Sequence, residues 1–295
     1  MTSPGASNRS LEADVALVTC GGPKGHPAED ERLAAALRRR NRTVAQPVWD
    51  DPSVDWSSFR IAVVRSTWDY FHRRNEFLRW VQRASARVDL WNPPRTLRWN
   101  TDKRYLRDLE RAGVPVVPTV WIPRGGKLDP DKLSPSERAH PVVVKPAVSA
   151  AGEETYRFAD ALSPAALRTA ERLATRGAVM VQSYLESVET IGERSLMYLG
   201  GRYSHAVRRT PLFPRRNRRR REPVVPASAG LRRLAAETIG ACPEELLYAR
   251  VDVVRGRDRR WRLLELEVTE PSLFFVPYPR GADTLAIAID RRLAR

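Results

Sequence analysis

Three acidic residues on two neighbouring strand candidates could together hold a divalent cation. The stretch LLELEVTEP, 263–271, alternates so that Glu265 and Glu267 share one face of a predicted strand. Asp252 lies in the preceding strand candidate, YARVDVV, and a charged turn joins the two as a hairpin. Carboxylates side by side repel each other unless a positive charge lies between them. Three such groups suit a hard cation, so we expect Mg²⁺ rather than zinc.

The alternative for these acids is a salt-bridged sheet face. Arg250 and Arg262 lie in the same two strand candidates and could be the cross-strand partners of the carboxylates. Glu270 is out of phase with the two glutamates and precedes Pro271, so we expect a structural role for it.

Lysine is rare in this chain, which makes the position of each lysine informative. All but five of the 51 Lys and Arg residues are arginine, and the net charge is +16. So strong an imbalance indicates a coding bias and weakens the basicity as a signal of nucleic-acid binding. Lys145 ends an apolar strand candidate, VVVK, where burial of a lysine is costly unless it faces an anion. Lys103 stands at a helix start, and the alternative for it is an ordinary exposed residue.

The order of these motifs resembles the ATP-grasp superfamily over nearly the whole chain. LLELEVTEP resembles the ELxNVTSP-type ending of glutathione synthetases, and this likeness implies that Asp252, Glu265 and Glu267 are magnesium ligands. Glu267 stands where those enzymes have a neutral asparagine, so the site here should be more negative. No GxxxxGK[ST] motif occurs, so phosphate binding of the P-loop kind is excluded.

Three further stretches resemble the ATP-binding parts of that superfamily. KPAVSAAGEETYRF is similar to the strand, loop and strand that close over phosphates, VMVQSYL to the strand leading to the adenine hinge, and GERS to the ribose-binding position. The resemblance implies ATP and Mg²⁺ as cofactors. The residues that it assigns to ATP are Lys103, Lys145, Ser149, Ala150, Gly152, Gln182, Ser183, Tyr184, Leu185 and Glu193. From the residues alone, SAAG could also be a hairpin turn, and Glu193 a surface acid paired with Arg194.

Two arginines are expected to act in catalysis. Arg209, in VRRTP, falls near the arginine that glutathione synthetases place on the transferred phosphate, and Arg250 is the second candidate. The following segment departs from the family pattern, because FPRRNRRRREPVVP has no glycine. Its arginine-dense part, 214–223, could hold a more acidic substrate or could be a solvated segment.

A polar loop after an apolar strand candidate is the expected substrate site. RSTWDY follows IAVV, and in an open α/β sheet ligands bind beyond the carboxyl ends of the strands. Arg65, Ser66 and Thr67 could hold a substrate carboxylate, and Asp69 an ammonium group. The alternative is a packed loop in which Arg65 pairs with Asp69.

The elements that position these residues predict an α/β protein with more than one lobe. Strand candidates alternate with helical patterns in the first third, which favours a parallel sheet covered on both faces, whereas closely spaced strands after residue 141 favour antiparallel pairing. The resemblance implies an ATP-grasp fold. We expect an N-terminal parallel-sheet substrate lobe, a small central lobe and a C-terminal antiparallel-sheet lobe with the metal site, at 1–100, 101–184 and 185–295.

The expected function is an ATP-dependent ligase that joins a carboxylate to a nitrogen through an acyl phosphate. RSTWDY, NPxxxLxWNTDKRYL, YSHAV and YARVD resemble the group containing the O-ureido-serine cyclo-ligase of cycloserine biosynthesis, which implies a small amino-acid-like substrate in secondary metabolism. Two alternatives stay open: a degenerate ATP-grasp protein that only binds nucleotide, and a nucleic-acid-binding protein using 214–223. No aromatic residues interleave with those arginines, so a stacking platform for bases is missing.

Composition sets the expected location and partners. The chain has two cysteines, far apart, and no apolar run of about 18 residues, so we expect a cytoplasmic protein without a disulfide framework, zinc site or membrane partner. We expect small-molecule substrates and no nucleic-acid partner, and the sequence leaves a homo-oligomer open.

Overall fold

The chain divides into two structural units. The computed structural model describes residues 12–22, 27–209 and 222–294. Unit 1 combines 1–94 with 269–295, and unit 2 contains 95–268. The expected first boundary lies close to the start of unit 2, whereas 269–295, expected in the third lobe, packs in unit 1. The arginine-dense segment 214–223 lies, up to residue 221, outside the described residues.

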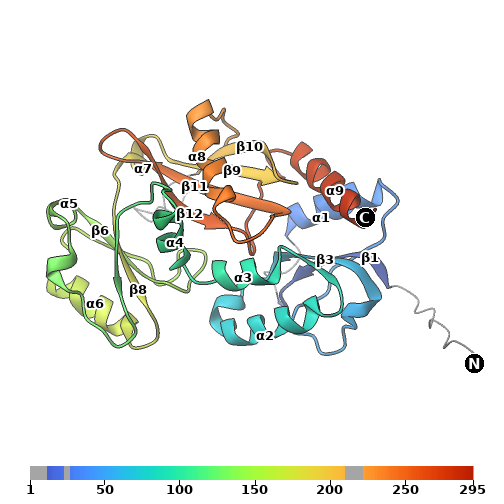
Figure 1. Cartoon of the computed structure of the whole chain (residues 1–295), viewed down its shortest axis with the longest axis horizontal. Helices are drawn as coiled ribbons and strands as arrows, with labels where there is room; N and C mark the ends of the chain where they lie inside the picture. The colour runs from blue at the N-terminus through green and yellow to red at the C-terminus, as the bar shows by residue number, and fades with distance from the viewer. Residues whose placement is uncertain (1–11, 23–26, 210–221, 295) are drawn as a thin grey trace, which may run out of the picture. The chain divides into compact units, whose positions relative to one another are not determined.

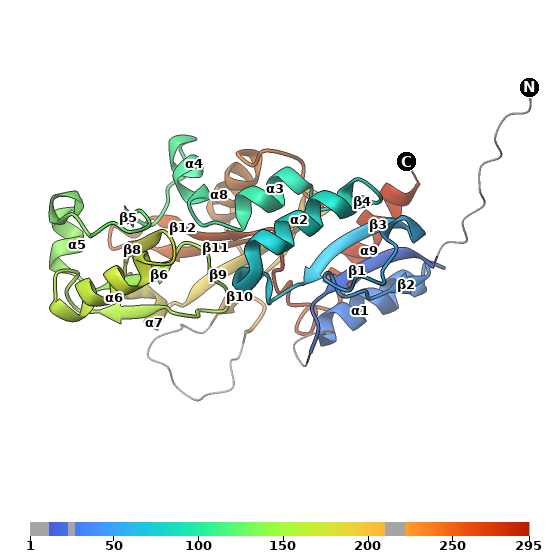
Figure 2. The same cartoon turned by 90° about the horizontal axis from the view of Figure 1, so that it is seen from below.

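Unit 1 is built on a parallel sheet with strand order β2-β1-β3-β4, of which β1 and β3 are labelled in Figure 1. The strands are β1 (Ala13–Thr19), β2 (Val44–Ala45), β3 (Phe59–Ser66) and β4 (Asp89–Trp91). Helix α2 (Arg74–Ser85) covers one face, and α1 (Ala28–Arg38) with α9 (Arg280–Leu293) covers the other (Figure 2). Strands covered on both faces read as near-continuous apolar runs, as β1 and β3 do. The predicted parallel sheet is confirmed.

The C-terminal helix α9 is held in unit 1 by apolar packing and ion pairs. Its buried side carries Leu285 and Ile289. On its polar side Asp290 pairs with Arg40 at 2.7 Å and with Arg42 at 2.6 Å. An amphipathic pattern predicts that a helix buries one face, but it does not identify the surface that covers that face.

Two antiparallel sheets make up unit 2, as the strand spacing predicted. The first has the order β5-β8-β6-β7. Its strands are β5 (Thr119–Ile122), β6 (Val142–Pro146), β7 (Tyr156–Phe158) and β8 (Val179–Ser183). Helix α6 (Pro164–Ala174) packs on β6 and β8. The edge strand β5 begins directly after Pro118, and proline is tolerated at such an edge because it cannot donate to a strand ladder.

The second sheet of unit 2 has the order β10-β9-β11-β12. Its strands are β9 (Glu193–Leu199), β10 (Arg202–Arg209), β11 (Tyr248–Arg255) and β12 (Trp261–Glu267). The predicted β11–β12 hairpin is present. Helix α8 (Ala229–Gly240) packs against β11 and β12, and α4 (Tyr105–Arg111) adds Tyr105, Leu106 and Leu109 to the same apolar cluster.

Shorter helical elements join the larger ones. They are α3 (Pro94–Asn100), α5 (Pro135–Ala139), α7 (Ser187–Thr190) and the 3₁₀ turns Trp56–Ser58, Tyr70–Arg73 and Pro130–Lys132. Within the described part of the chain, no helix combines the length and apolar character that crossing a membrane requires.

Candidate active site

One face of the β10-β9-β11-β12 sheet is apolar and the other is charged. Val251, Val253 and Leu266 belong to the apolar cluster under α8 and α4. Because side chains alternate along a strand, the residues between them project to the opposite face. Asp252 lies directly across from Glu265, and neighbouring positions bring Arg250 opposite Glu267. The apolar half of the alternation thus fixes which face carries the charges.

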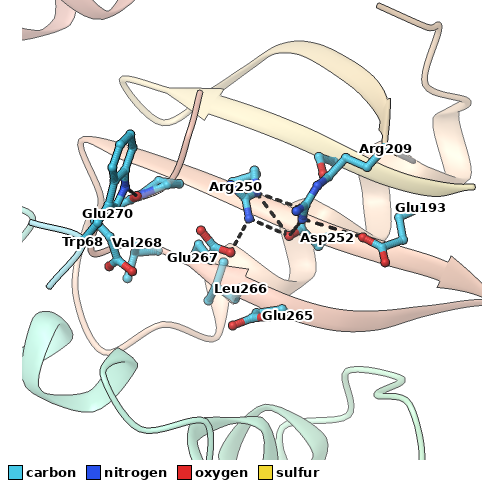
Figure 3. A network of polar contacts seen from close by, with 12 residues as sticks. Trp68, Glu193, Arg209, Arg250, Asp252, Glu265, Leu266, Glu267, Val268 and Glu270 are labelled. Carbon is cyan, nitrogen blue, oxygen red and sulfur yellow. Dashed lines mark hydrogen bonds and ion pairs between the residues drawn. The ribbon is translucent and has the colours of Figure 1, made fainter. Parts of the chain in front are cut away.

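Asp252 is the best-satisfied carboxylate on the charged face (Figure 3). Its Oδ1 accepts hydrogen bonds from the Ser195 hydroxyl at 2.5 Å and from Arg250 Nε at 3.0 Å. Its Oδ2 accepts from Arg250 Nη2 at 2.9 Å and from Arg209 Nη1 at 3.0 Å. Burial would raise the pKa of Asp252, but the charges of Arg250 and Arg209 hold it below the ordinary value. Asp252 is therefore an anion that two arginines share.

The two glutamates of β12 have different cationic partners. Arg250 donates a hydrogen bond to Glu267 Oε1, and Lys103 lies 3.1 Å from Glu265 Oε1. Burial raises the pKa of Glu267 to about 7, and the charge of Glu265 adds to this although Arg250 opposes it. Burial would likewise raise the pKa of Glu265, but Lys103 and Lys145 hold it below the ordinary value.

Lys103 and Lys145 both act on Glu265 of β12. Lys103 Nζ also donates to the carbonyl of Ser149, and its backbone N–H donates to Ala147 O at 2.9 Å. Lys145 ends β6 and is buried, and this burial lowers its pKa, although the charge of Glu265 opposes the shift. Lys103 therefore links the small-residue loop after β6 to the charged face.

The loop after β6 contains a turn with positive backbone φ values. Ala151 and Gly152 both have positive φ values, 52° and 73°. Successive backbone N–H groups in a turn can converge on one point and form an anion-binding concavity. The Glu153 N–H donates to Ala150 O at 3.0 Å, as in a turn between strands, and phosphate binding by this loop stays a prediction.

Glu193 lies at the edge of the charged face, at the start of β9. It is the cross-strand partner of Arg209, whose Nη1 lies 3.6 Å from Glu193 Oε2. Burial raises the pKa of Glu193, although the charge of Arg209 opposes this. The alternative pairing of its carboxylate with Arg194 is not what the structure shows, because Arg194 Nη1 bonds backbone carbonyls of its own turn. The ribose role of Glu193 stays a prediction.

The predicted adenine hinge, 182–185, is buried and fastened from several sides. Gln182 Nε2 donates to Thr119 Oγ1 at 3.2 Å, and Arg257 donates to the carbonyl of Tyr184 at 2.8 Å. The Tyr184 hydroxyl donates to Glu189 at 2.7 Å.

Ser183 Oγ, in the same segment, is buried without a hydrogen-bond partner among the described residues. Leu185 is also buried, in a small apolar cluster with Tyr184. Adenine binding by this segment stays a prediction.

The predicted substrate residues lie in unit 1, on the loop that follows β3, and two of them already have charged partners. Arg65 Nε donates to Asp30 at 3.0 Å rather than to Asp69, which is the partner that the alternative reading expected. Asp69 accepts from Arg73 at 2.6 Å and from the Trp49 indole at 2.9 Å.

The two hydroxyls of the same loop differ from each other. Ser66 Oγ donates to Thr19 Oγ1 at 2.8 Å, whereas the buried Thr67 Oγ1 has no hydrogen-bond partner in the described part of the chain. Trp68 Nε1 donates to the carbonyl of Glu270 at 3.0 Å, in keeping with the structural role expected for the chain around that residue (Figure 3). Substrate binding by residues 65–69 stays a prediction.

The charged face offers suitable donors for magnesium, although the carboxylates are not gathered as a ready cage. Among residues 12–22, 27–209 and 222–294, no three His, Cys, Asp or Glu side chains converge as a metal-binding group. Arg209, Arg250 and Lys103 are instead the cations that lie against these carboxylates. Carboxylates this close need positive charge, and the side chains of the protein provide it here. The donor type and the cross-strand register fit Mg²⁺.

Ser195 is a residue of the charged face that sequence reasoning missed. It is fully buried and lies opposite Asp252 on β9, two residues after Glu193 in GERS. A serine in a strand carries no signal by itself. The one sequence clue was its spacing of two from Glu193, which predicts that both residues share a face.

Comparisons of fold place the chain among the ATP-grasp proteins. It superimposes on D-alanine–D-alanine ligase from Bacillus anthracis, solved also with ATP, with a TM-score of 0.67, 15% identity and coverage of 95% of this chain and 97% of that chain. The ATP-grasp ligase PsnB, solved with a minimal precursor, Mg and ADP, gives a TM-score of 0.64 at 18% identity, with coverage of 97% of this chain and 100% of that chain. These likenesses show an ATP-grasp fold, as the motifs predicted.

Closer relatives identify the family. The profile of the N-terminal domain of D-cycloserine synthetase DcsG matches residues 15–92. The cycloserine biosynthesis protein DcsG of Streptomyces lavendulae is 35% identical over 282 residues, which cover 88% of this chain and 92% of that protein. The crystal structure of D-cycloserine synthetase DcsG matches with a TM-score of 0.85 at 34% identity, over 95% of this chain and 99% of that chain. The chain belongs to the DcsG family of ATP-grasp ligases, and the expected class, a ligase that forms a C–N bond, is confirmed.

Proposed function

We propose that the protein uses Mg-ATP to activate the carboxylate of a small amino-acid-like substrate and then joins it to a nitrogen nucleophile. In the first step a carboxylate oxygen attacks the γ-phosphorus, and ADP leaves. The nitrogen then attacks the acyl carbon, the C–O bond to phosphate breaks, and inorganic phosphate leaves with one oxygen of the substrate. The nitrogen loses its proton as the new C–N bond forms.

The observation that carries this proposal is the exchangeable charge pairing on the face formed by β10, β9, β11 and β12. Lys103 contacts Glu265 and the carbonyl of Ser149, and Arg250 contacts Glu267. A bound triphosphate would replace these groups as the partner of the two cations, and a bound metal cation would replace Lys103 and Arg250 as the partner of the carboxylates. Transfer of a phosphoryl group is catalysed mainly by positioning and by positive charge aimed at the moving oxygens. A face with four cations and four carboxylates side by side is suited to this exchange. The cations are Lys103, Lys145, Arg209 and Arg250, and the carboxylates are those of Glu193, Asp252, Glu265 and Glu267.

The proposal assigns a part to the residues of the charged face, of the loop 149–152 and of the hinge 182–185. Lys103 and Lys145 bind phosphate oxygens together with the backbone of the loop 149–152, which includes Ser149, Ala150 and Gly152. Arg209 and Arg250 stabilise the charge on the transferred phosphoryl group and on the acyl phosphate. Asp252, Glu265 and Glu267 hold Mg²⁺, which when bound neutralises phosphate oxygens. The hinge residues 182–185 line adenine, and Glu193 contacts ribose.

The relatives guide the choice of substrate. The DcsG relative is named for D-cycloserine synthesis, so we propose that a ureido- or amino-substituted serine-like acid is the substrate and that the bond closes within one molecule. The loop 65–69 is the proposed substrate-binding segment. Thr67 is its best candidate, because its hydroxyl has no hydrogen-bond partner among the described residues.

The test is ADP release with Mg-ATP across a panel of amino acids, O-ureido-serine-like acids and paired amine acceptors. We expect release with one class of acid, and Glu265→Gln should lower it by about 100-fold, a loss typical of removing one electrostatic group from such a site. Asp258→Asn is the matched control, because Asp258 lies in the exposed β11–β12 turn and pairs with Arg262. An acid labelled with ¹⁸O in its carboxylate should transfer one label to phosphate. Wild-type protein that neither binds nor hydrolyses ATP would contradict the proposal.

A further inference from the structure

Ser195 is a neutral donor among charged partners. It is fully buried on β9, and its hydroxyl donates to Asp252 Oδ1 at 2.5 Å from the position directly across the sheet. The other donors to Asp252 are the guanidinium groups of Arg209 and Arg250. The carboxylate is therefore held from β9, from β10 and from its own strand.

Each of the two arginines also contacts a second carboxylate besides Asp252. Among the described residues, the Ser195 hydroxyl does not. Arg209 also faces Glu193 at 3.6 Å, and Arg250 also donates to Glu267. A bound phosphate would add a further anion for both guanidinium groups, which prefer planar contacts with carboxylate or phosphate. A hydroxyl carries no net charge, so a phosphate does not draw it away in the same manner. Of these donors, the Ser195 hydroxyl is the one whose bond to Asp252 can persist when ligand binds.

We propose that Ser195 is a positioning residue that fixes the Asp252 carboxylate in the orientation from which it binds a divalent cation. This inference rests on the proposed function, since it requires Asp252 to be a metal ligand. By bonding Oδ1 from β9, the serine limits rotation of the carboxylate, which lies across the hairpin from Glu265. Partners of this kind orient ligating carboxylates, and their loss typically weakens metal binding by about 10- to 100-fold.

The experiment measures Mn²⁺ binding by the full-length protein, from the electron paramagnetic resonance signal of free Mn²⁺, without ATP turnover. We expect Ser195→Ala to raise the Kd for Mn²⁺ about tenfold or more. Ser195→Thr keeps a hydroxyl and a strand-compatible side chain, so it should restore the Kd to within about threefold of wild type. Thr238→Val is the matched control. It removes another buried hydroxyl of unit 2, which donates to Leu234 O at 2.8 Å on α8, and should leave the Kd unchanged while lowering thermal stability.

The outcomes separate this inference from the function beneath it. Wild-type affinity in Ser195→Ala would overturn the role of Ser195 and leave the ligase proposal standing. An equal rise in Kd for Ser195→Ala and Thr238→Val would also overturn it, because the effect would then follow loss of stability. A wild-type protein that binds no Mn²⁺ and no ATP would overturn the proposed function and this inference together.

Discussion

Two sets of buried charges in this protein are organised in opposite ways. In unit 1, Arg65 and Asp30 form a pair in which both side chains are almost wholly buried, 1% and 2% exposed. On the charged face of unit 2, the partly exposed Glu265 and Glu267 meet Lys103 and Arg250, and each of these two cations has a second partner. The first arrangement locks one conformation, whereas the second can exchange partners.

The difference separates structural charge from charge available for chemistry. A fully desolvated pair is costly to open, because each ion left alone stays out of water. A shared network loses less free energy when an anionic ligand replaces one of its carboxylate contacts, because the cation is not left without a partner. The sequence motif RSTWDY and the motif LLELEVTEP both contain charged residues beside apolar strands, and only the partners in the folded chain distinguish them.

The largest effect should come from breaking the locked pair. Arg65→Met leaves Asp30 buried without its partner, and we expect a loss of about 3–5 kcal/mol in the free energy of unfolding. Urea denaturation at neutral pH measures this loss. The double variant Arg65→Met/Asp30→Asn should recover at least half of it, since replacing both ions removes the unpaired charge.

The same variants test the predicted substrate role of Arg65. If the double variant regains stability and keeps the wild-type KM for the acid substrate, Arg65 is structural. A stable double variant with a strongly raised KM would instead support the prediction that Arg65 binds the substrate carboxylate. A single variant that loses less than about 1 kcal/mol would contradict the locked pair itself.

On the shared face, the next largest effect should fall on catalysis. Lys103→Met removes a cation that contacts Glu265 and the carbonyl of Ser149, and we expect ADP release to fall by about 10²- to 10³-fold. Stability should change much less than in Arg65→Met, because Lys145 still faces Glu265. Lys132→Met, at an exposed lysine of the same unit, is the control and should keep full activity. Equal losses of stability for Lys103→Met and Arg65→Met would contradict the distinction between the locked pair of unit 1 and the charged face of unit 2.

How far the sequence predicts this site depends on how local each feature is. The alternation in LLELEVTEP determines that Glu265 and Glu267 share a face, and the hairpin with Asp252 follows from the charged turn. The identity of each partner is not local. Asp30 lies 35 residues before Arg65, and the position of Arg250 opposite Glu267 depends on a register that includes a bulge after Asp252.

The fold shows the same division between local and distant features. The parallel sheet, the antiparallel strands and the hairpin follow from periodicity and spacing. The return of α9 to unit 1 does not, because its ion pairs involve arginines about 250 residues away, at Arg40 and Arg42. Apolar periodicity predicts that one face of a helix is buried, but it does not identify the part of the chain that covers this face.

A smaller effect should follow from changing the charge of Glu267, the position at which glutathione synthetases resembling this chain have asparagine. Glu267→Asn removes one of the proposed anionic ligands, so we expect the Kd for Mn²⁺ to rise about tenfold. The measurement is the same free-Mn²⁺ titration, with Asp258→Asn of the exposed turn as a control that should match wild type. An unchanged Kd in Glu267→Asn would remove Glu267 from the metal ligands and leave it as the partner of Arg250.

The smallest effect should come from a third kind of charge, the ion pairs at the rim of unit 1. Asp290 on α9 accepts from Arg40 and Arg42, and these hydrogen bonds hold its pKa below the ordinary value. Because the folded-state pKa is depressed, Asp290 stabilises the fold above its unfolded pKa of about 3.9, and this contribution is lost as the pH falls through the lower, folded value. Since solvent screens the pairs, we expect Asp290→Asn to cost about 0.5 kcal/mol at pH 7.

Salt and pH distinguish this rim pair from the locked pair. The difference in unfolding free energy between wild type and Asp290→Asn should shrink toward zero in about 1 M NaCl, where the screening length is about 3 Å. It should also shrink below about pH 4, where the carboxylate of the unfolded chain is already protonated. The cost of Arg65→Met should persist in the same salt, because water and ions do not reach the pair of Arg65 with Asp30. Equal salt sensitivity of the two variants would show that burial does not separate these charges.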